Sequence, residues 1–189
     1  EVNGEVPCTT TLQFFNRDGR LHLAASLRSN DAYRGLPHDV FCFTMLQEMM
    51  ARRLGLELGE YGQMVGSFHL YDTDRDYAAG YVKEGHHRLE EMPAMPVGDP
   101  FELISDLLHV EGIIRSADSN AAEAVASFPA FWAVGIRPAQ AKLARGAEEL
   151  DQIRAALKHK AYEAYIDDRK DVLAKRAAKA KAESQGVNK

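Results

Sequence analysis

Hydrophobic and polar positions alternate near the start of the chain as they do in β-strands. Residues 8–16 are rich in threonine and aromatic side chains, which favour strands. In residues 20–28 a leucine or alanine recurs at every second position, which indicates a strand with one buried face. The intervening Asp18-Gly19 pair favours a tight turn, because both residues tolerate a positive φ. The pattern therefore predicts a β-hairpin.

The period changes after a loop that ends at Pro37. Apolar residues in 38–54 recur at helical spacing and form a broad surface, which predicts a helix central to the core. Residues 61–71 resemble a strand again, and 74–91 predict a charged amphipathic helix.

Prolines and a glycine interrupt residues 92–100, which are incompatible with the interior of a helix or a central strand. Beyond this connector the pattern is helical to the end of the chain. We predict helices over residues 101–115, 119–134 and 138–180. The expected organisation is a mixed region over 1–91, a connector over 92–100 and a helical region over 101–189.

Composition narrows the class of protein. The 189 residues carry a net charge of −5, which argues against a surface built to hold nucleic acid. The apolar runs are too short to span a bilayer, so we expect no membrane association. Cys8 and Cys42 have neither metal-ligand nor disulfide-framework spacing, and a cytoplasmic location is the simplest expectation. Because the sequence begins at Glu1, an upstream segment is also expected.

The first two clusters of candidate functional residues surround the hairpin. Cys8 opens the first strand; a lone cysteine is most often a small buried hydrophobe, and a nucleophilic role requires a cation and a pocket nearby. Arg28, Ser29 and Asp31 end the second strand. An arginine followed by a hydroxyl suits a phosphate, whereas polar capping of a turn is the simpler alternative.

Two further clusters follow. Gly35 and Asp39 enter the predicted core helix, where an aspartate is an ordinary N-cap or first-turn residue. His69 and Tyr71 point the same way from one strand, and could bind sugar hydroxyls or simply pack.

Together, in order and spacing, the four clusters resemble the second half of the thymidylate synthase family, from about Val6 to Tyr71. The resemblance implies an α+β fold, with a mixed sheet packed against helices and a mostly helical C-terminal region. It also implies a homodimer with shared active sites, a pyrimidine nucleoside monophosphate as substrate and 5,10-methylenetetrahydrofolate as cofactor.

The resemblance assigns a role to each cluster. Cys8 matches the nucleophile that adds to C6 of the pyrimidine. Phosphate contacts are implied for Arg28 and Ser29. Asp31 matches the aspartate that meets the pterin and the pyrimidine, and Gly35 is expected to border both ligands. The remaining pair, His69 and Tyr71, is implied to bind the 3′-hydroxyl of the sugar.

Asp39 departs from the family pattern, because thymidylate synthases carry asparagine there. A carboxylate accepts a hydrogen bond from the exocyclic amine of cytosine, and a protonated one also donates to N3. Aspartate matches the cytidylate hydroxymethylases of the family, which implies 5-hydroxymethylation of CMP or dCMP. Methylation of dUMP, or a non-catalytic nucleotide-binding role, remains open. The family's catalytic glutamate and its partner-donated arginines lie upstream of the cysteine, outside this sequence.

Overall fold

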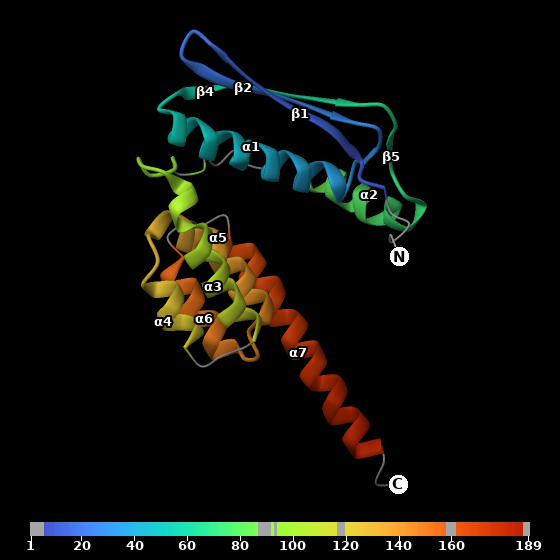
Figure 1. The fold of residues 1–189 in the computed structure, drawn as a ribbon. Coiled ribbons are helices and arrows are strands. Elements are labelled where there is room, and N and C mark those ends of the chain that lie inside the picture. Colours follow the sequence, from blue (N-terminus) through green and yellow to red (C-terminus); the bar gives the residue numbers. More distant parts are fainter. Residues whose placement is uncertain (1–5, 87–91, 93, 117–119, 158–161, 187–189) are drawn as a thin grey trace. The chain divides into compact units, whose positions relative to one another are not determined.

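The computed structural model describes residues 6–86, 92, 94–116, 120–157 and 162–186, and has an α+β fold (Figure 1). The chain divides into two compact units. The first, here called the sheet unit, comprises residues 1–91 and 95–102. The second, the helical unit, comprises 92–94 and 103–189.

Three strands form the main sheet, in the order β1-β2-β4. They span Thr9–Arg17, Arg20–Leu27 and Glu57–Val65. β1 and β2 are antiparallel, whereas β2 and β4 are parallel, so the sheet is mixed as expected. The hairpin prediction is confirmed: φ is 50° at Asp18 and 77° at Gly19, and both central residues of the turn have the positive φ that the sequence suggested.

The core of the sheet unit forms where helix α1, Gly35–Leu54, covers one face of the sheet (Figure 1). The alternate residues of β2 predicted to face inward are all buried, with Leu23 and Ala25 each only 1% exposed. Gln47 is buried on α1 and its Nε2 donates to the carbonyl of Leu21 at 2.8 Å, which ties the helix to the sheet. The helix begins three residues before the predicted start.

The strand predicted over 61–71 has different bounds in the structure. β4 begins earlier, at Glu57, because it pairs along the length of β2, and it ends at Val65. After Gly66-Ser67 the chain forms β5, Phe68–His69, which pairs in parallel with β3, Asn30–Asp31.

A short helical segment follows β5 in the sheet unit. A 3-10 turn, η1, spans Asp72–Asp74 and leads into α2, Arg75–Glu84. Gly85, with a φ of 78°, ends α2 earlier than predicted, and residues 87–91 of the prediction lie outside the described residues. Met95, in the predicted connector, donates its backbone N–H to Glu48 of α1 at 2.8 Å.

The helical unit contains more and shorter helices than predicted. After the 3-10 turn η2 the described helices are α3, α4, α5, α6 and α7 (Figure 1). Their bounds are Pro100–Leu103 for η2, then Ile104–Arg115, Ala121–Ala126, Ala130–Leu143, Ala147–Ala156 and Glu163–Gly186.

Two of the helix predictions in this unit are wrong in their bounds. The region 119–134 is divided before Pro129, because the nitrogen of proline has no N–H to donate within a continuing helix. Pro138 was expected to start a helix, but it lies inside α5. The region 138–180 is divided near Gly146 and Leu157, where the backbone turns to extended conformations.

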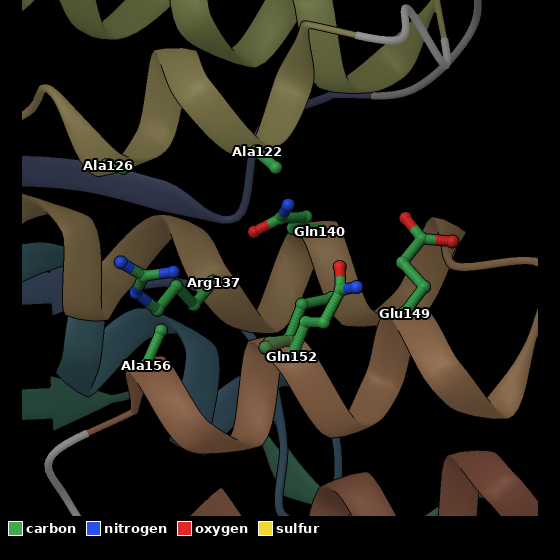
Figure 2. Close-up of a pocket in the computed structure, with 8 residues that line it drawn as sticks. Ala122, Ala126, Arg137, Gln140, Glu149, Gln152 and Ala156 are labelled. Carbon is green, nitrogen blue, oxygen red and sulfur yellow. The ribbon is translucent and has the colours of Figure 1, made fainter.

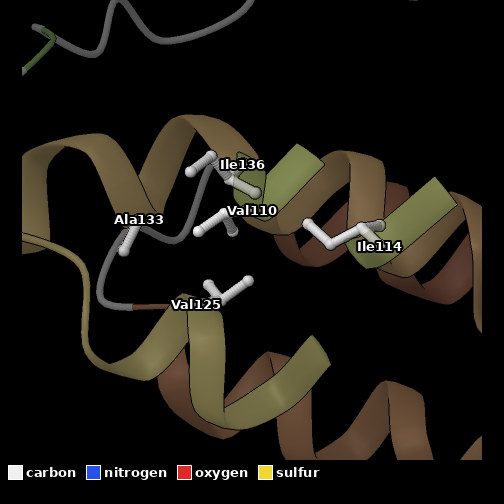
Figure 3. Packing of buried hydrophobic residues seen from close by; sticks show 5 residues of the cluster. All are labelled: Val110, Ile114, Val125, Ala133 and Ile136. Carbon is white, nitrogen blue, oxygen red and sulfur yellow. The ribbon is translucent and has the colours of Figure 1, made fainter. Parts of the chain in front are cut away.

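Small aliphatic side chains hold the helical unit together. Two clusters of buried residues form its core. Figure 3 shows the first, Val110, Ile114, Val125, Ala133 and Ile136. The second comprises Ala141, Ala144, Leu150, Ile153 and Ile166. None of the described helices is both long and apolar enough to cross a membrane.

Candidate functional site

Cys8 lies exposed just before β1, beside the end of β2. The backbone N–H of Arg28 donates to the carbonyl of Cys8 at 2.9 Å. The guanidinium of Arg28 folds toward the residues before the cysteine, where Nε donates to Pro7 at 3.2 Å and Nη2 to Val6 at 2.7 Å. A guanidinium has five N–H donors, so these contacts leave others for an anion. The structure thus brings the predicted nucleophile and the predicted phosphate ligand together.

Ser29, His69 and Tyr71 adjoin this pair. The hydroxyl of Ser29 lies 3.5 Å from Nδ1 of His69, and the rings of His69 and Tyr71 meet edge to face with centroids 4.9 Å apart. Tyr71 follows β5 rather than belonging to it, so the shared strand face that we predicted is replaced by a direct ring contact. Tyr71 remains exposed, which leaves its hydroxyl accessible to a ligand.

Asp31 is buried and caps the start of α1. Its carboxylate accepts backbone N–H groups from Arg34 at 2.6 Å, Gly35 at 3.1 Å and Tyr33 at 3.3 Å. Burial by itself raises the pKa of Asp31, but the three N–H donors and the charge of His69 outweigh it and lower the pKa below its usual value. The carboxylate therefore ties β3 to the start of α1.

Gly35 allows a close approach that any side chain would block. A Cβ atom there would lie only 2.2 Å from Oδ1 of Asn30. Asn30 is itself buried, and its Nδ2 has no hydrogen-bond partner. Asn30 lies in the same sequence cluster as Arg28 and Asp31, but the sequence assigned it no role. A buried donor without a partner beside Asp31 and Gly35 fits a polar heterocycle that presents an acceptor.

Asp39 lies in the second turn of α1 and is half-buried. The simpler alternative for Asp39, an N-cap or first-turn carboxylate, does not hold, because the helix begins at Gly35 and the Asp31 carboxylate accepts the N–H of Gly35. Burial, followed by the charge of Asp39, raises the pKa of Tyr61 on β4. The Tyr61 hydroxyl donates to Gln63 at 2.6 Å. Asp39 is thus free of a capping role and lies within electrostatic range of β4.

An ion pair that the sequence did not reveal supports the site. Arg34, at the start of α1, pairs with the buried Asp74 of η1. Hydrogen bonding to Asp74, together with its charge, raises the pKa of Arg34. The pair connects the segment after Tyr71 to the helix that carries Asp39. Its members are far apart in the sequence, and no local pattern could have indicated it.

The described residues contain no group of three or more histidine, cysteine or acidic side chains arranged to hold a metal ion. The fold and the grouped side chains define an α+β domain with a thiol, an arginine and an imidazole gathered at the ends of its strands. The family model for thymidylate synthase matches residues 4–119. The chain belongs to the thymidylate synthase family, and the match continues well beyond Tyr71, where we had expected the resemblance to fade.

Several known proteins are similar to part of the chain. Thymidylate synthase 1 of Bacillus spizizenii and the thymidylate synthase of Bacillus phage phi3T are each 43% identical over 70 residues, covering 37% of this chain and 25% of the relative. For the thymidylate synthase of Bacillus atrophaeus the identity is the same and 31% of the relative is covered. The solved thermostable thymidylate synthase A from Bacillus subtilis is 36% identical, covers 44% of this chain and 30% of its own, and has a TM-score of 0.40. The chain therefore spans about a quarter of the length of such relatives.

Proposed function

We propose that this chain contributes the nucleophile and much of the nucleotide pocket of an enzyme that 5-hydroxymethylates a cytidine monophosphate, either CMP or dCMP. Cys8 adds to C6 of the ring, which makes C5 nucleophilic toward a one-carbon unit. An exocyclic methylene would remain at C5 once C5 has lost its proton and tetrahydrofolate has departed. Water would then add to this methylene, and cleavage of the bond between Cys8 and C6 would restore the ring and the thiolate. The observation that carries this proposal is Asp39, a carboxylate on α1 that has no capping role.

Cytosine and uracil present different hydrogen-bond donors and acceptors at the edge that Asp39 would contact. Cytosine offers an amine at C4 and an acceptor at N3, whereas uracil offers an acceptor at O4 and a donor at N3. An ionised carboxylate only accepts, so it would leave O4 of uracil without a donor. A mismatch of buried polar groups is strongly rejected, since both partners lose their hydrogen bonds with water. Asp39 therefore favours cytosine.

The other members of the site have complementary tasks. The guanidinium of Arg28 keeps N–H donors free for a phosphate, and Ser29 adds a hydroxyl beside it. His69 and Tyr71 hold each other edge to face, an arrangement that would present an imidazole nitrogen and a phenol to the 3′-hydroxyl. The groups come from separate strands and loops, and the mutual hydrogen bonds of those loops hold them in place.

The folate, when bound, supplies the one-carbon unit. Asp31 and Gly35 are the residues proposed to border it, and the unpartnered Nδ2 of Asn30 fits an acceptor on such a ring. Because three backbone N–H groups occupy the carboxylate of Asp31, that carboxylate is held ionised and its orientation is restricted. A homodimer that shares active-site residues is part of the proposal, as is nucleotide biosynthesis as the setting.

The relatives favour a second candidate, methylation of dUMP, because those named above are thymidylate synthases. In that case Asp39 would not determine the base. A non-catalytic nucleotide-binding role is the third possibility, and it predicts binding without product. The Cys8→Ser variant separates the last case. In an enzyme this substitution should abolish product formation while nucleotide binding is retained, whereas a non-catalytic protein would form no product even as wild type.

The decisive experiment compares the full natural protein with its Asp39→Asn variant. Each is incubated with methylenetetrahydrofolate and CMP, dCMP or dUMP, and the product is identified by mass. We expect a gain of one hydroxymethyl group on a cytidylate, and a shift of preference toward dUMP in the variant by about tenfold or more. Asp106→Asn is a matched control, because Asp106 is exposed on α3. Unchanged preference for uracil in both proteins would disprove the cytosine assignment.

A further inference from the structure

The helical unit contains a cavity of about 170 Å³ that the nucleotide chemistry of the sheet unit does not use. Residues of α4, α5 and α6 line it. Alanine residues of α4 and α6 leave the space open, and polar side chains project between the helices (Figure 2). A pocket for a drug-sized ligand has about 300 Å³ or more. This cavity therefore suits a smaller molecule than a nucleotide.

Gln140 is the first sign of a ligand. Its side chain is only 5% exposed, lines the cavity, and carries an Oε1 atom with no hydrogen-bond partner. A buried carbonyl without a donor costs free energy, typically about 1–3 kcal/mol. The helices satisfy their own backbone, so the protein gains no structural hydrogen bond in return. A ligand that donates an N–H or O–H group would satisfy this atom.

Arg137 is the second sign. It lies one turn before Gln140 on α5, is half-buried, and is paired with no carboxylate of the described residues. Burial lowers the pKa of its guanidinium, because a charge is less stable away from water. A guanidinium in this state is well suited to a carboxylate, which can accept two of its N–H groups at once.

Glu149 limits which anions fit. It lines the same cavity, and in Figure 2 it lies at the opposite end of the row from Arg137, with Gln140 and Gln152 between them. One of its oxygens accepts the backbone N–H of Arg145 at 3.0 Å, which fixes the carboxylate at the start of α6. A ligand with negative charge at both ends would be repelled by Glu149. One with a carboxylate at one end and a donor at the other would not.

We propose that this cavity binds a small carboxylic acid that also carries a hydroxyl or ammonium donor, with the carboxylate at Arg137 and the donor near Gln140. A hydroxy acid and an amino acid share this chemistry. They differ in their interaction with Glu149, whose negative charge would strengthen binding of an ammonium group but would add little to the binding of a hydroxyl. The proposal does not depend on the function of the sheet unit.

The test uses three ligands that share the same carbon skeleton, namely propanoate, L-lactate and L-alanine. Inorganic phosphate serves as an anion of different shape. Binding to the full chain is measured by calorimetry and by NMR shifts of the α5 residues. We expect saturable binding of lactate or alanine, at least about threefold tighter than propanoate, which lacks the donor. If none of these probes saturates at millimolar concentrations, or if phosphate binds as well as lactate and alanine do, the proposal is wrong.

Three substitutions assign the contacts. Arg137→Met keeps the length of the side chain and should weaken binding at least about tenfold, whereas Arg115→Met, at an exposed site on α3, should not. Gln140→Leu removes the unpartnered carbonyl, so it should weaken binding of lactate while leaving the fold intact or more stable. If the protein prefers alanine to lactate and the Glu149→Gln variant has lost that preference, the ligand is the amino acid rather than the hydroxy acid. Unchanged affinity in both Arg137→Met and Gln140→Leu would overturn the site.

Discussion

Asp31 and Gln47 in the sheet unit and Gln140 in the helical unit are buried polar side chains with different surroundings. In the sheet unit, Asp31 is buried at the end of a strand and Gln47 where a helix meets the sheet, and both bond to backbone groups. In the helical unit the helices satisfy most of their own backbone groups. Gln140 is buried there with its carbonyl oxygen unpaired.

This difference helps to separate structural from functional polar groups. The burial of the Asp31 side chain is explained by the three backbone N–H groups that donate to its carboxylate. Atoms that remain unpartnered need another explanation, and a ligand is one. Nδ2 of Asn30 in the sheet unit and Oε1 of Gln140 in the helical unit are both of this kind, and both adjoin the places where we propose that ligands bind.

The largest expected effect tests whether the two units are separate in stability. Leu23 on β2 is 1% exposed and Leu150 on α6 is fully buried. Leu23→Ala and Leu150→Ala should each destabilise their own unit by about 3 kcal/mol, through lost burial and the cavity left behind. Hydrogen exchange followed by mass spectrometry should show faster exchange in one unit only. Equal acceleration in both units by either variant would mean that they unfold as one.

The same contrast explains which parts of the fold the sequence could predict. The hairpin was predicted well, since the alternation of β2 and the Asp18-Gly19 turn are local signals. The helical unit was predicted as helix but divided wrongly. Alanine, lysine and glutamate favour a helix over most of that region, and the prediction missed the breaks at Pro129 and Gly146. Pro138 misled the prediction because α5 tolerates it within the helix.

For the candidate site, the sequence could indicate residues but not their contacts. The family resemblance selected its residues, and the structure brings Cys8, Arg28, Ser29 and His69 close together. Hydrogen bonds between separate segments could not be read from local sequence. For that reason the sequence could not show that Asp31, rather than Asp39, accepts the first N–H groups of α1.

The second prediction concerns that cap and its dependence on pH. Asp31→Asn removes the negative charge of a carboxylate that accepts three backbone N–H groups. The substitution should destabilise the sheet unit by about 1–2 kcal/mol at neutral pH. The folded-state pKa of Asp31 is lowered from 3.8. The charged carboxylate therefore contributes stability above the unfolded-state pKa, and this contribution is lost as the pH falls through the folded-state pKa.

Urea unfolding of the two proteins, followed by signals of the sheet unit, measures the effect. The difference in unfolding free energy between wild type and variant should be full at neutral pH and should shrink in acid. The helical unit should be unaffected at either pH. A difference that stays constant into acid would show that geometry, rather than the charge of Asp31, makes the cap.

The last prediction compares the effect of adding one methyl group to a glycine in each unit. Gly35 begins α1 against Oδ1 of Asn30, so Gly35→Ala must displace that side chain and should destabilise the sheet unit by about 1–2 kcal/mol. Gly135 is exposed on α5 with open space where a Cβ would lie, so Gly135→Ala should stabilise the helical unit by about 0.5–1 kcal/mol through helix propensity. Thermal unfolding resolved by unit should show opposite signs. If Gly35→Ala also stabilises its unit, the Asn30 side chain is free to move, and its unpartnered Nδ2 would no longer indicate a fixed ligand contact.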